Sequence, residues 1–205
     1  MNNRARLKRI LSSHPPQPIG EFRRFAVLLP LVYQNGEPHL LYEKRSKRIS
    51  QPGESAFPGG RIEPGETVEQ AAVRETIEEL GIAKEKIEVY GRWNPLITWF
   101  NMLIEPVTGE LSRFHPERFV PNEEVEEIFL VPLSFFIHNE PKTYRSLLRV
   151  EQPEDFPYEL LPNEKAYRFR TGKQDTLFWV YQDRVIWGLT ARITKDFIDA
   201  VKEEL

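Results

Sequence analysis

The 205-residue sequence contains no cysteine. This absence excludes disulfide bonds, thiolate metal ligands and a cysteine nucleophile. Long apolar runs are also missing, because the longest, residues 25–33, is too short to span a bilayer. Residues 1–20 lack the apolar core of a secretory signal. A reducing compartment is compatible with this composition, and we expect a cytoplasmic protein without a membrane partner.

An excess of charge of one sign is likewise absent. The chain carries 28 basic and 31 acidic residues, a net charge of −3. This balance gives no reason to expect nucleic acid or an anionic membrane as the main partner. The length fits one large domain, or one domain with an extension, and suffices for a substantial core.

The first residues differ in character from the rest of the chain. Residues 3–12 have the composition of a short basic helix, which His14-Pro15-Pro16 would end. We therefore expect two parts: an N-terminal helix and linker at 1–20, and a single domain at 21–205. The first part could be a tether, a contact in a homodimer, or a segment without a role.

The remaining pattern mixes strands with helices. Asn35-Gly36 lies between the apolar runs 24–34 and 37–45, which predicts a β-hairpin. Residues 67–80 read as a helix, with Thr67 as its cap and Gly81 as its stop. Further strands are predicted at 85–93, 102–107, 126–131, 143–151, 165–171 and 176–182, and further helices at 133–138 and 187–204. The order suggests a mixed sheet covered by helices, in the α/β class.

The predicted helix at 67–80 carries a cluster of acidic residues. Glu75, Glu78 and Glu79 share one face, where like charges repel. Two interpretations are open. The face could be solvated, as most charged helix faces are, or the carboxylates could hold a divalent cation together with substrate phosphates.

The spacing around this helix favours the cation. Gly60 and Glu66 precede the run Arg74-Glu75-Thr76-Ile77-Glu78-Glu79-Leu80-Gly81-Ile82. This pattern resembles the Nudix box, G-x5-E-x7-R-E-U-x-E-E-x-G-U, in which U is a bulky aliphatic residue. Thr76 is the one departure. So many positions fixed in order make a chance match improbable.

The resemblance to the Nudix family implies a Nudix-type α/β/α sandwich, in which a mixed sheet carries the box helix and a C-terminal helix. It also implies hydrolysis of a nucleoside diphosphate linked to another group, with Mg²⁺ or Mn²⁺ as cofactor. The family's roles transfer to matching positions: cation ligands at Glu78, Glu79 and the Gly60 carbonyl, a ligand or base at Glu75, an orienting guanidinium at Arg74, and support from Glu66.

The segment before the box points to a substrate. Leu41, Arg45-Ser46, Gly53 and residues 57–60 resemble the L-L-T-x-R-S and G-x3-F-P-G-G signature of the coenzyme A diphosphatase subgroup. Tyr42-Glu43 depart from it, and residues 47–52 form a shorter stretch than expected. Residues 119–133 and 186–191 are also similar. The implied reaction releases 3′,5′-ADP and 4′-phosphopantetheine from coenzyme A or its thioesters.

Several residues could contact this small nucleotide substrate. Arg45, Ser46 and Phe57 belong to the signature, and Arg45, Lys47 and Arg48 could meet phosphate oxygens. Lys47 and Arg48 are equally consistent with ordinary surface charges, and Phe57 with a core aromatic.

A further carboxylate is expected from a downstream loop. Of Glu123, Glu124, Glu126 and Glu127 we favour Glu124, and we interpret His115 and His138 as structural.

Two alternatives stay open. The same chemistry could act on ADP-ribose or a dinucleotide, or the chain could sense a nucleotide without cleaving it. The complete set of Arg74, Glu75, Glu78 and Glu79 argues against the sensor.

Overall fold

The structure, a computed structural model, describes residues 2–120 and 122–204. Its helices are α1 (Asn3–Ser13), α2 (Val68–Leu80), α3 (Leu133–His138) and α4 (Gly188–Val201). Its strands are β1 (Arg23–Gln34), β2 (Glu37–Arg45), β3 (Ser55–Ala56), β4 (Gly59–Arg61), β5 (Ile87–Arg92), β6 (Leu96–Ile97), β7 (Met102–Leu111), β8 (Val125–Pro132), β9 (Lys142–Leu148), β10 (Gly172–Tyr181) and β11 (Arg184–Trp187).

The main sheet is mixed and is built around β1. This strand pairs with β7 in parallel and with β2 and β4 antiparallel. The turn between β1 and β2 has φ of 52° at Asn35 and 84° at Gly36, as a two-residue hairpin turn with matching twist requires. The predicted hairpin is therefore confirmed, as is the α/β class.

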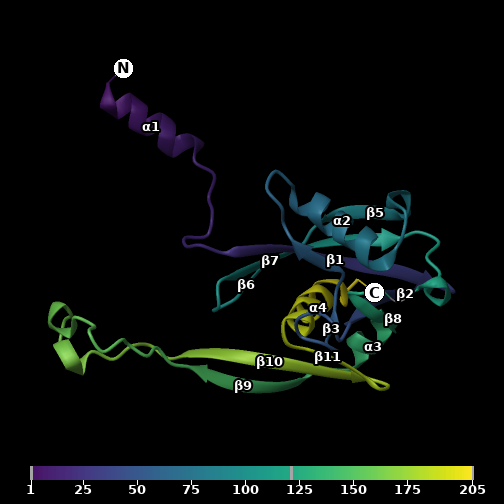
Figure 1. Cartoon of the computed structure of the whole chain (residues 1–205). Coiled ribbons are helices and arrows are strands. Elements are labelled where there is room, and N and C mark those ends of the chain that lie inside the picture. Colours follow the sequence, from purple (N-terminus) through teal and green to yellow (C-terminus); the bar gives the residue numbers. More distant parts are fainter. Residues whose placement is uncertain (1, 121, 205) are drawn as a thin grey trace.

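Helices cover both faces of this sheet (Figure 1). Ala26, Leu28 and Leu41 pack with buried residues of α2 on one face. Leu29 and Tyr42, their neighbours in the chain, pack with α3 and α4 on the other. Because successive side chains of a strand point to opposite faces, a strand covered on both sides is apolar throughout. The expected sandwich, with the box helix and the C-terminal helix on opposite faces, is confirmed.

The β1–β2 hairpin opens toward one end, and residues 55–61 fill the opening. β3 pairs with β2, while β4 pairs with β1. Pro58 lies between them and its carbonyl accepts a hydrogen bond from the Leu28 N–H at 2.8 Å. A Cβ at Gly59 would lie 2.3 Å from the Ala26 carbonyl oxygen. Only glycine permits this approach, which brings residues 59–60 next to α2.

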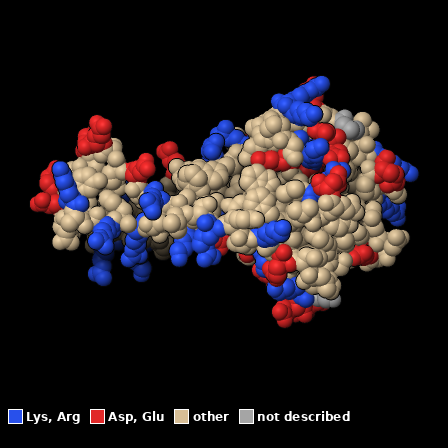
Figure 2. All heavy atoms as spheres, turned by 90° about the horizontal axis from the view of Figure 1, so that it is seen from below, with Lys and Arg blue, Asp and Glu red and all other residues tan. Residues whose placement is uncertain are grey.

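A second sheet forms a projecting arm. β10 pairs antiparallel with β9 and β11, and β9 and β10 extend away from the body (Figure 1). Figure 2 shows the arm with Lys and Arg along one margin and with Asp and Glu at its tip. The strand predicted at 165–171 is wrong, because Glu164–Ala166 form a single 3₁₀ turn at the tip and no strand follows before Gly172. Phe169 packs against Phe156 and Tyr167 there instead.

The N-terminal helix α1 has no buried residue and lies away from the body (Figure 1). A division of the chain after residue 20 and a role of α1 in a homodimer both stay predictions. Among the helices of residues 2–120 and 122–204, none has the length and apolarity needed to cross a membrane.

Candidate active site

Helix α2 is fixed at both ends, which sets the direction of its glutamates. Thr67 caps the first turn: its side chain accepts from the Gln70 N–H, and the Gln70 side chain accepts from the Thr67 N–H. Gly81 ends the helix in the left-handed conformation, with φ of 62°. Both predicted termini are thus confirmed.

Arg74 lies at the centre of the acidic cluster. Its guanidinium donates to Glu66 at 2.8 Å, to Glu75 at 2.8 Å and to Glu78 at 3.3 Å. These bonds keep the guanidinium charged and raise the pKa of Arg74, and they lower the pKa of Glu66. Because its donors form a rigid fork, Arg74 fixes several carboxylates at once.

The three stacked glutamates differ in environment. The Glu78 side chain is 59% exposed, that of Glu75 is 15% exposed, and Glu79 as a whole residue is only 4% exposed. Glu79 accepts a hydrogen bond from the Gly59 N–H at 2.7 Å. Burial raises the pKa of Glu75, and it raises the pKa of Glu79 to about 8. Charge repulsion from Glu75 also raises the pKa of Glu79, and repulsion from Glu79 raises the pKa of Glu43. A bound cation would relieve this repulsion.

Gly60 and Glu75 fit against each other. A Cβ at Gly60 would lie 2.2 Å from Glu75 Oε1 and 2.3 Å from its Cδ. The bare glycine therefore leaves the space that this carboxylate occupies.

We expect Gly60→Ala to lower the rate of hydrolysis roughly tenfold to hundredfold, since the methyl group must displace the Glu75 carboxylate and small misplacements of catalytic groups have effects of this size. Steady-state kinetics would measure the change. Gly172→Ala is the control, because a Cβ there meets only Leu148 at 3.4 Å. Equal activity in both variants would show that the Glu75 position is unimportant.

The loop that precedes β8 brings in Glu124. Asn122 organises this loop: its Oδ1 accepts from the N–H groups of Glu124 and Val125 at 2.9 and 2.8 Å. Its Nδ2 donates to the Glu79 carbonyl at 2.7 Å. Asn122 was missed in the sequence, although an asparagine that bonds the backbone two residues ahead is a common turn signal.

These groups line one cavity of about 660 Å³, the central hollow. Its acidic side holds Glu75, Glu79 and Glu124, with Gly60 beside them. Its basic residues are Arg23, Arg45 and Arg61, of which sequence reasoning identified only Arg45. Phe57 also lines it, although this residue is buried and stacks on Tyr42 with ring centroids 4.8 Å apart.

The carboxylates of Glu75, Glu79 and Glu124 in the central hollow suit a hard divalent cation, which prefers oxygen ligands. No three His, Asp or Glu side chains within residues 2–120 and 122–204 converge closely enough to enclose an ion. Arg74 instead serves as counter-ion to Glu75 and Glu78. A cation would compete with Arg74 for these carboxylates.

One buried acid was also missed. Glu43 on β2 is fully buried, and neither of its carboxylate oxygens has a hydrogen-bond partner in the described part of the chain. Burial raises the pKa of Glu43 well above its usual value, and the nearby Glu79 raises it further. Burying a carboxylate without a partner costs free energy. Because Glu79 raises the pKa of Glu43, the charge of Glu43 interacts with the acidic residues of the central hollow.

Other predicted contacts lie elsewhere. Ser46, Lys47 and Arg48 line a different hollow together with Glu123, and Arg48 approaches Glu123 at 3.6 Å. Ser46 accepts from the Arg48 N–H and shapes this loop. Their contact with substrate stays a prediction.

Comparison with known proteins finds a matching family model. A profile described as NUDIX domain matches residues 22–150, more than half of the chain. The peroxisomal coenzyme A diphosphatase NUDT7 of Mus musculus is 36% identical over 65% of this chain and 56% of its own length. The mitochondrial coenzyme A diphosphatase NUDT8 of Homo sapiens is 32% identical over 83% of this chain and 66% of its own. The chain thus spans about three fifths of the length of these two relatives.

Two more matches cover most of the chain. The uncharacterized Nudix hydrolase NudL of Photorhabdus laumondii is 31% identical over 92% of this chain and 90% of its own length. A crystal structure of a MutT/nudix family protein from Enterococcus faecalis covers 99% of this chain and 70% of its own, with 16% identity and a TM-score of 0.50. The last likeness concerns the fold alone.

Proposed function

The chain belongs to the Nudix family, and from this premise we propose that it hydrolyses the diphosphate bond of coenzyme A or its derivatives, giving 3′,5′-ADP and 4′-phosphopantetheine. The single observation that carries the proposal is the central hollow, which is lined by carboxylates from α2 and from the loop at Glu124 together with three arginines. The names of two relatives support coenzyme A as the substrate. A cytoplasmic location stays a prediction, as these names refer to peroxisomes and mitochondria.

The proposed cofactor is Mg²⁺ or Mn²⁺, held by Glu75, Glu78, Glu79 and the Gly60 carbonyl, with Glu124 closing the site. When bound, the cation would neutralise the diphosphate and lower the pKa of water. The largely buried side chain of Glu75 suits either of two roles, as a cation ligand or as the base that takes a proton from the attacking water. Arg74 and Glu66 hold Glu75 in place.

The arginines supply binding and charge stabilisation. Arg23, Arg45 and Arg61 line the same hollow as the acidic residues. Their guanidinium groups can donate paired hydrogen bonds to phosphate oxygens. Water attacks one phosphorus of the diphosphate and the bond from that phosphorus to the bridging oxygen breaks. Each product keeps one of the two diphosphate phosphates, and 3′,5′-ADP also keeps its 3′-phosphate. Fixed donors stabilise the charge that develops on the leaving oxygen.

A substrate panel tests the proposal. The purified protein is incubated with coenzyme A, ADP-ribose and NADH, each with Mg²⁺, Mn²⁺ or EDTA, and the products are separated by chromatography. We expect 3′,5′-ADP from coenzyme A with either metal and none with EDTA. Turnover of ADP-ribose or NADH without turnover of coenzyme A would contradict coenzyme A as the substrate. No turnover of any of the three would favour a nucleotide sensor.

A further inference from the structure

The central hollow is one part of a longer groove. It shares Phe100, Leu189 and Thr190 with a connecting hollow of about 300 Å³. The connecting hollow shares Gln174, Asp175 and Arg192 with a third cavity of about 780 Å³, the distal hollow. Each cavity approaches or falls within the size range of ordinary ligand sites. A groove this long suits a substrate with a sizeable group attached to its diphosphate.

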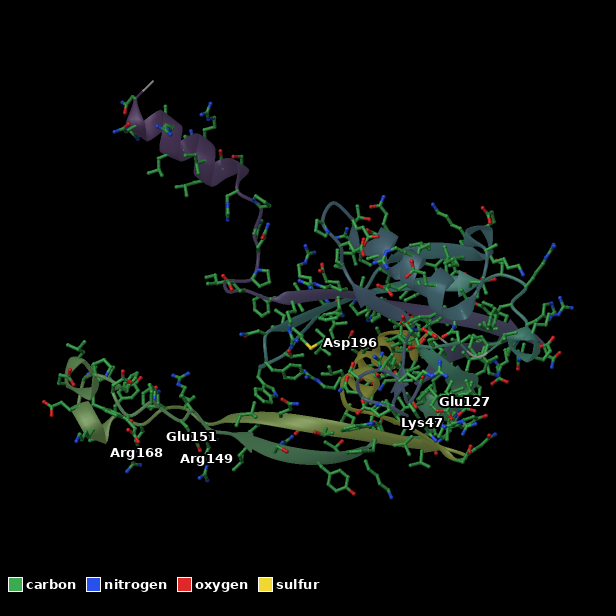
Figure 3. The ribbon with its side chains drawn as sticks, viewed as in Figure 1. Lys47, Glu127, Arg149, Glu151, Arg168 and Asp196 are labelled. Atoms are coloured by element: carbon green, nitrogen blue, oxygen red, sulfur yellow. The ribbon has the colours of Figure 1, made fainter. Side chains whose placement is uncertain are left out.

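The distal hollow lies between α4, the β6–β7 hairpin and the base of the arm. Trp99, at the tip of that hairpin, is 65% exposed and lines it. Asp196 of α4, labelled in Figure 3, also lines it. Except for Ile97 and Trp99, its lining comes from the arm and α4. Most of these residues follow residue 150, where the match to the NUDIX domain ends.

Most charges in the distal hollow are already matched. Arg145 donates twice to Asp175, at 2.6 and 2.8 Å. Lys195 donates to Asp199 at 2.6 Å. The Asp196 carboxylate accepts from the Trp93 indole N–H and the Asn94 amide.

Two basic residues that line the distal hollow differ from Arg145 and Lys195. Neither Arg192 nor Lys173 makes an ion pair with a carboxylate in the described part of the chain. Both lie near Asp175, but the bidentate contact with Arg145 already engages that carboxylate. The hollow therefore offers an exposed indole and two positive charges without ion-pair partners among the described residues, together with the Asp196 carboxylate, which hydrogen-bonds to neutral donors.

This combination fits one chemical class. Bases stack on exposed aromatic side chains, and guanidinium and ammonium groups bind phosphate. We propose that the distal hollow binds the phosphorylated nucleoside half of the substrate, with the base on Trp99 and a phosphate outside the cleaved diphosphate on Arg192 and Lys173. This inference rests on the proposed function and makes Arg192 a determinant of specificity.

A binding experiment tests the inference without requiring hydrolysis. Calorimetry with Mg²⁺ present compares adenosine 3′,5′-bisphosphate with adenosine 5′-monophosphate. For the native protein we expect at least tenfold tighter binding of the bisphosphate. Arg192→Gln should remove most of this preference, since a charge-assisted hydrogen bond is worth roughly tenfold to hundredfold in affinity. Trp99→Leu should weaken both ligands roughly tenfold to hundredfold.

Arg149→Gln is the matched control. Arg149 is an exposed arginine on the same arm, away from Asp196 in Figure 3, and it lines none of the three hollows. It should leave both affinities unchanged. Thermal denaturation of each variant checks that the fold is intact.

The remaining outcomes separate this inference from the proposed function. Equal affinities for native protein and Arg192→Gln, or no binding of the bisphosphate by the native protein, would overturn the inference. If the protein hydrolyses coenzyme A, the ratio of kcat/KM for coenzyme A to kcat/KM for dephospho-coenzyme A gives a second test. The same ratio in Arg192→Gln and in the native protein would also overturn the inference. Binding through Arg192 without turnover of any diphosphate would uphold this site and overturn the proposed reaction.

Discussion

Glu79→Gln is expected to lower kcat for diphosphate hydrolysis by about 10³-fold, because a cation that activates water contributes several kcal/mol to catalysis. Glu79 is nearly buried beside the central hollow, and one of its oxygens already accepts from Gly59. The glutamine keeps this hydrogen bond, so the fold should persist while the charge is lost. Kinetics with saturating Mn²⁺ and calorimetric titration of Mn²⁺ would measure both effects.

The control for this variant lies on the same helix. Glu69→Gln also removes one carboxylate from α2, but Glu69 faces Arg92, at 2.6 Å, and does not line the central hollow. We expect Glu69→Gln to retain native kcat and Mn²⁺ affinity. If Glu79→Gln kept full activity, Glu79 would not belong to the cation site.

Glu43→Gln is expected to raise the Tm of the metal-free protein at pH 8 by about 5 °C. Its carboxylate is fully buried without a hydrogen-bond partner among the described residues, and Glu79 and Glu124 add repulsion that Arg45 only partly offsets. A buried unpaired charge costs several kcal/mol, and removal of about 2 kcal/mol of this cost gives a shift of this size in a domain of this length. Thermal denaturation followed by circular dichroism measures it.

The same buried acids predict a dependence of stability on pH. Burial raises the pKa of Glu79 to about 8, and the pKa of Glu43 is raised as well. The folded state therefore binds more protons than the unfolded state, and this contribution to stability is complete below the ordinary pKa of a glutamate. It is lost as pH rises toward 8. The metal-free protein should accordingly be less stable at pH 8 than at pH 5, and Mn²⁺ should reduce the difference.

The pH dependence also supplies the control for Glu43. Because the pKa of Glu43 is raised, more of the native carboxyl is protonated at pH 5 than at pH 8, so the gain from Glu43→Gln should be smaller at pH 5. Glu37→Gln, on the exposed start of the same strand, should leave the Tm unchanged at both pH values. A loss of Tm in Glu43→Gln that is equal at pH 5 and pH 8 would contradict the electrostatic explanation and indicate a packing role.

The elements that were predicted correctly are those whose signals are local. Asn35-Gly36 can form the hairpin turn without help from the rest of the chain, and Thr67 and Gly81 mark the ends of α2 through their own backbone preferences. The strands β6 and β11 were missed because each is very short. Residues 165–171 have strand-like alternation, but they pack their aromatic rings at the tip of the arm instead of pairing.

By itself, the sequence determined the family, the hairpin, the box helix and the acidic residues with Arg74 and Gly60, because these depend on residue types at fixed spacing. Only the tertiary structure decided what surrounds each group. The tertiary structure buries Glu79 and Glu43 and leaves Glu78 exposed to solvent. It also places Arg48 in a different hollow from the central one. Desolvation and repulsion depend on packing from distant segments, so neither the raised pKa values nor the groove toward Arg192 could be inferred from spacing along the chain.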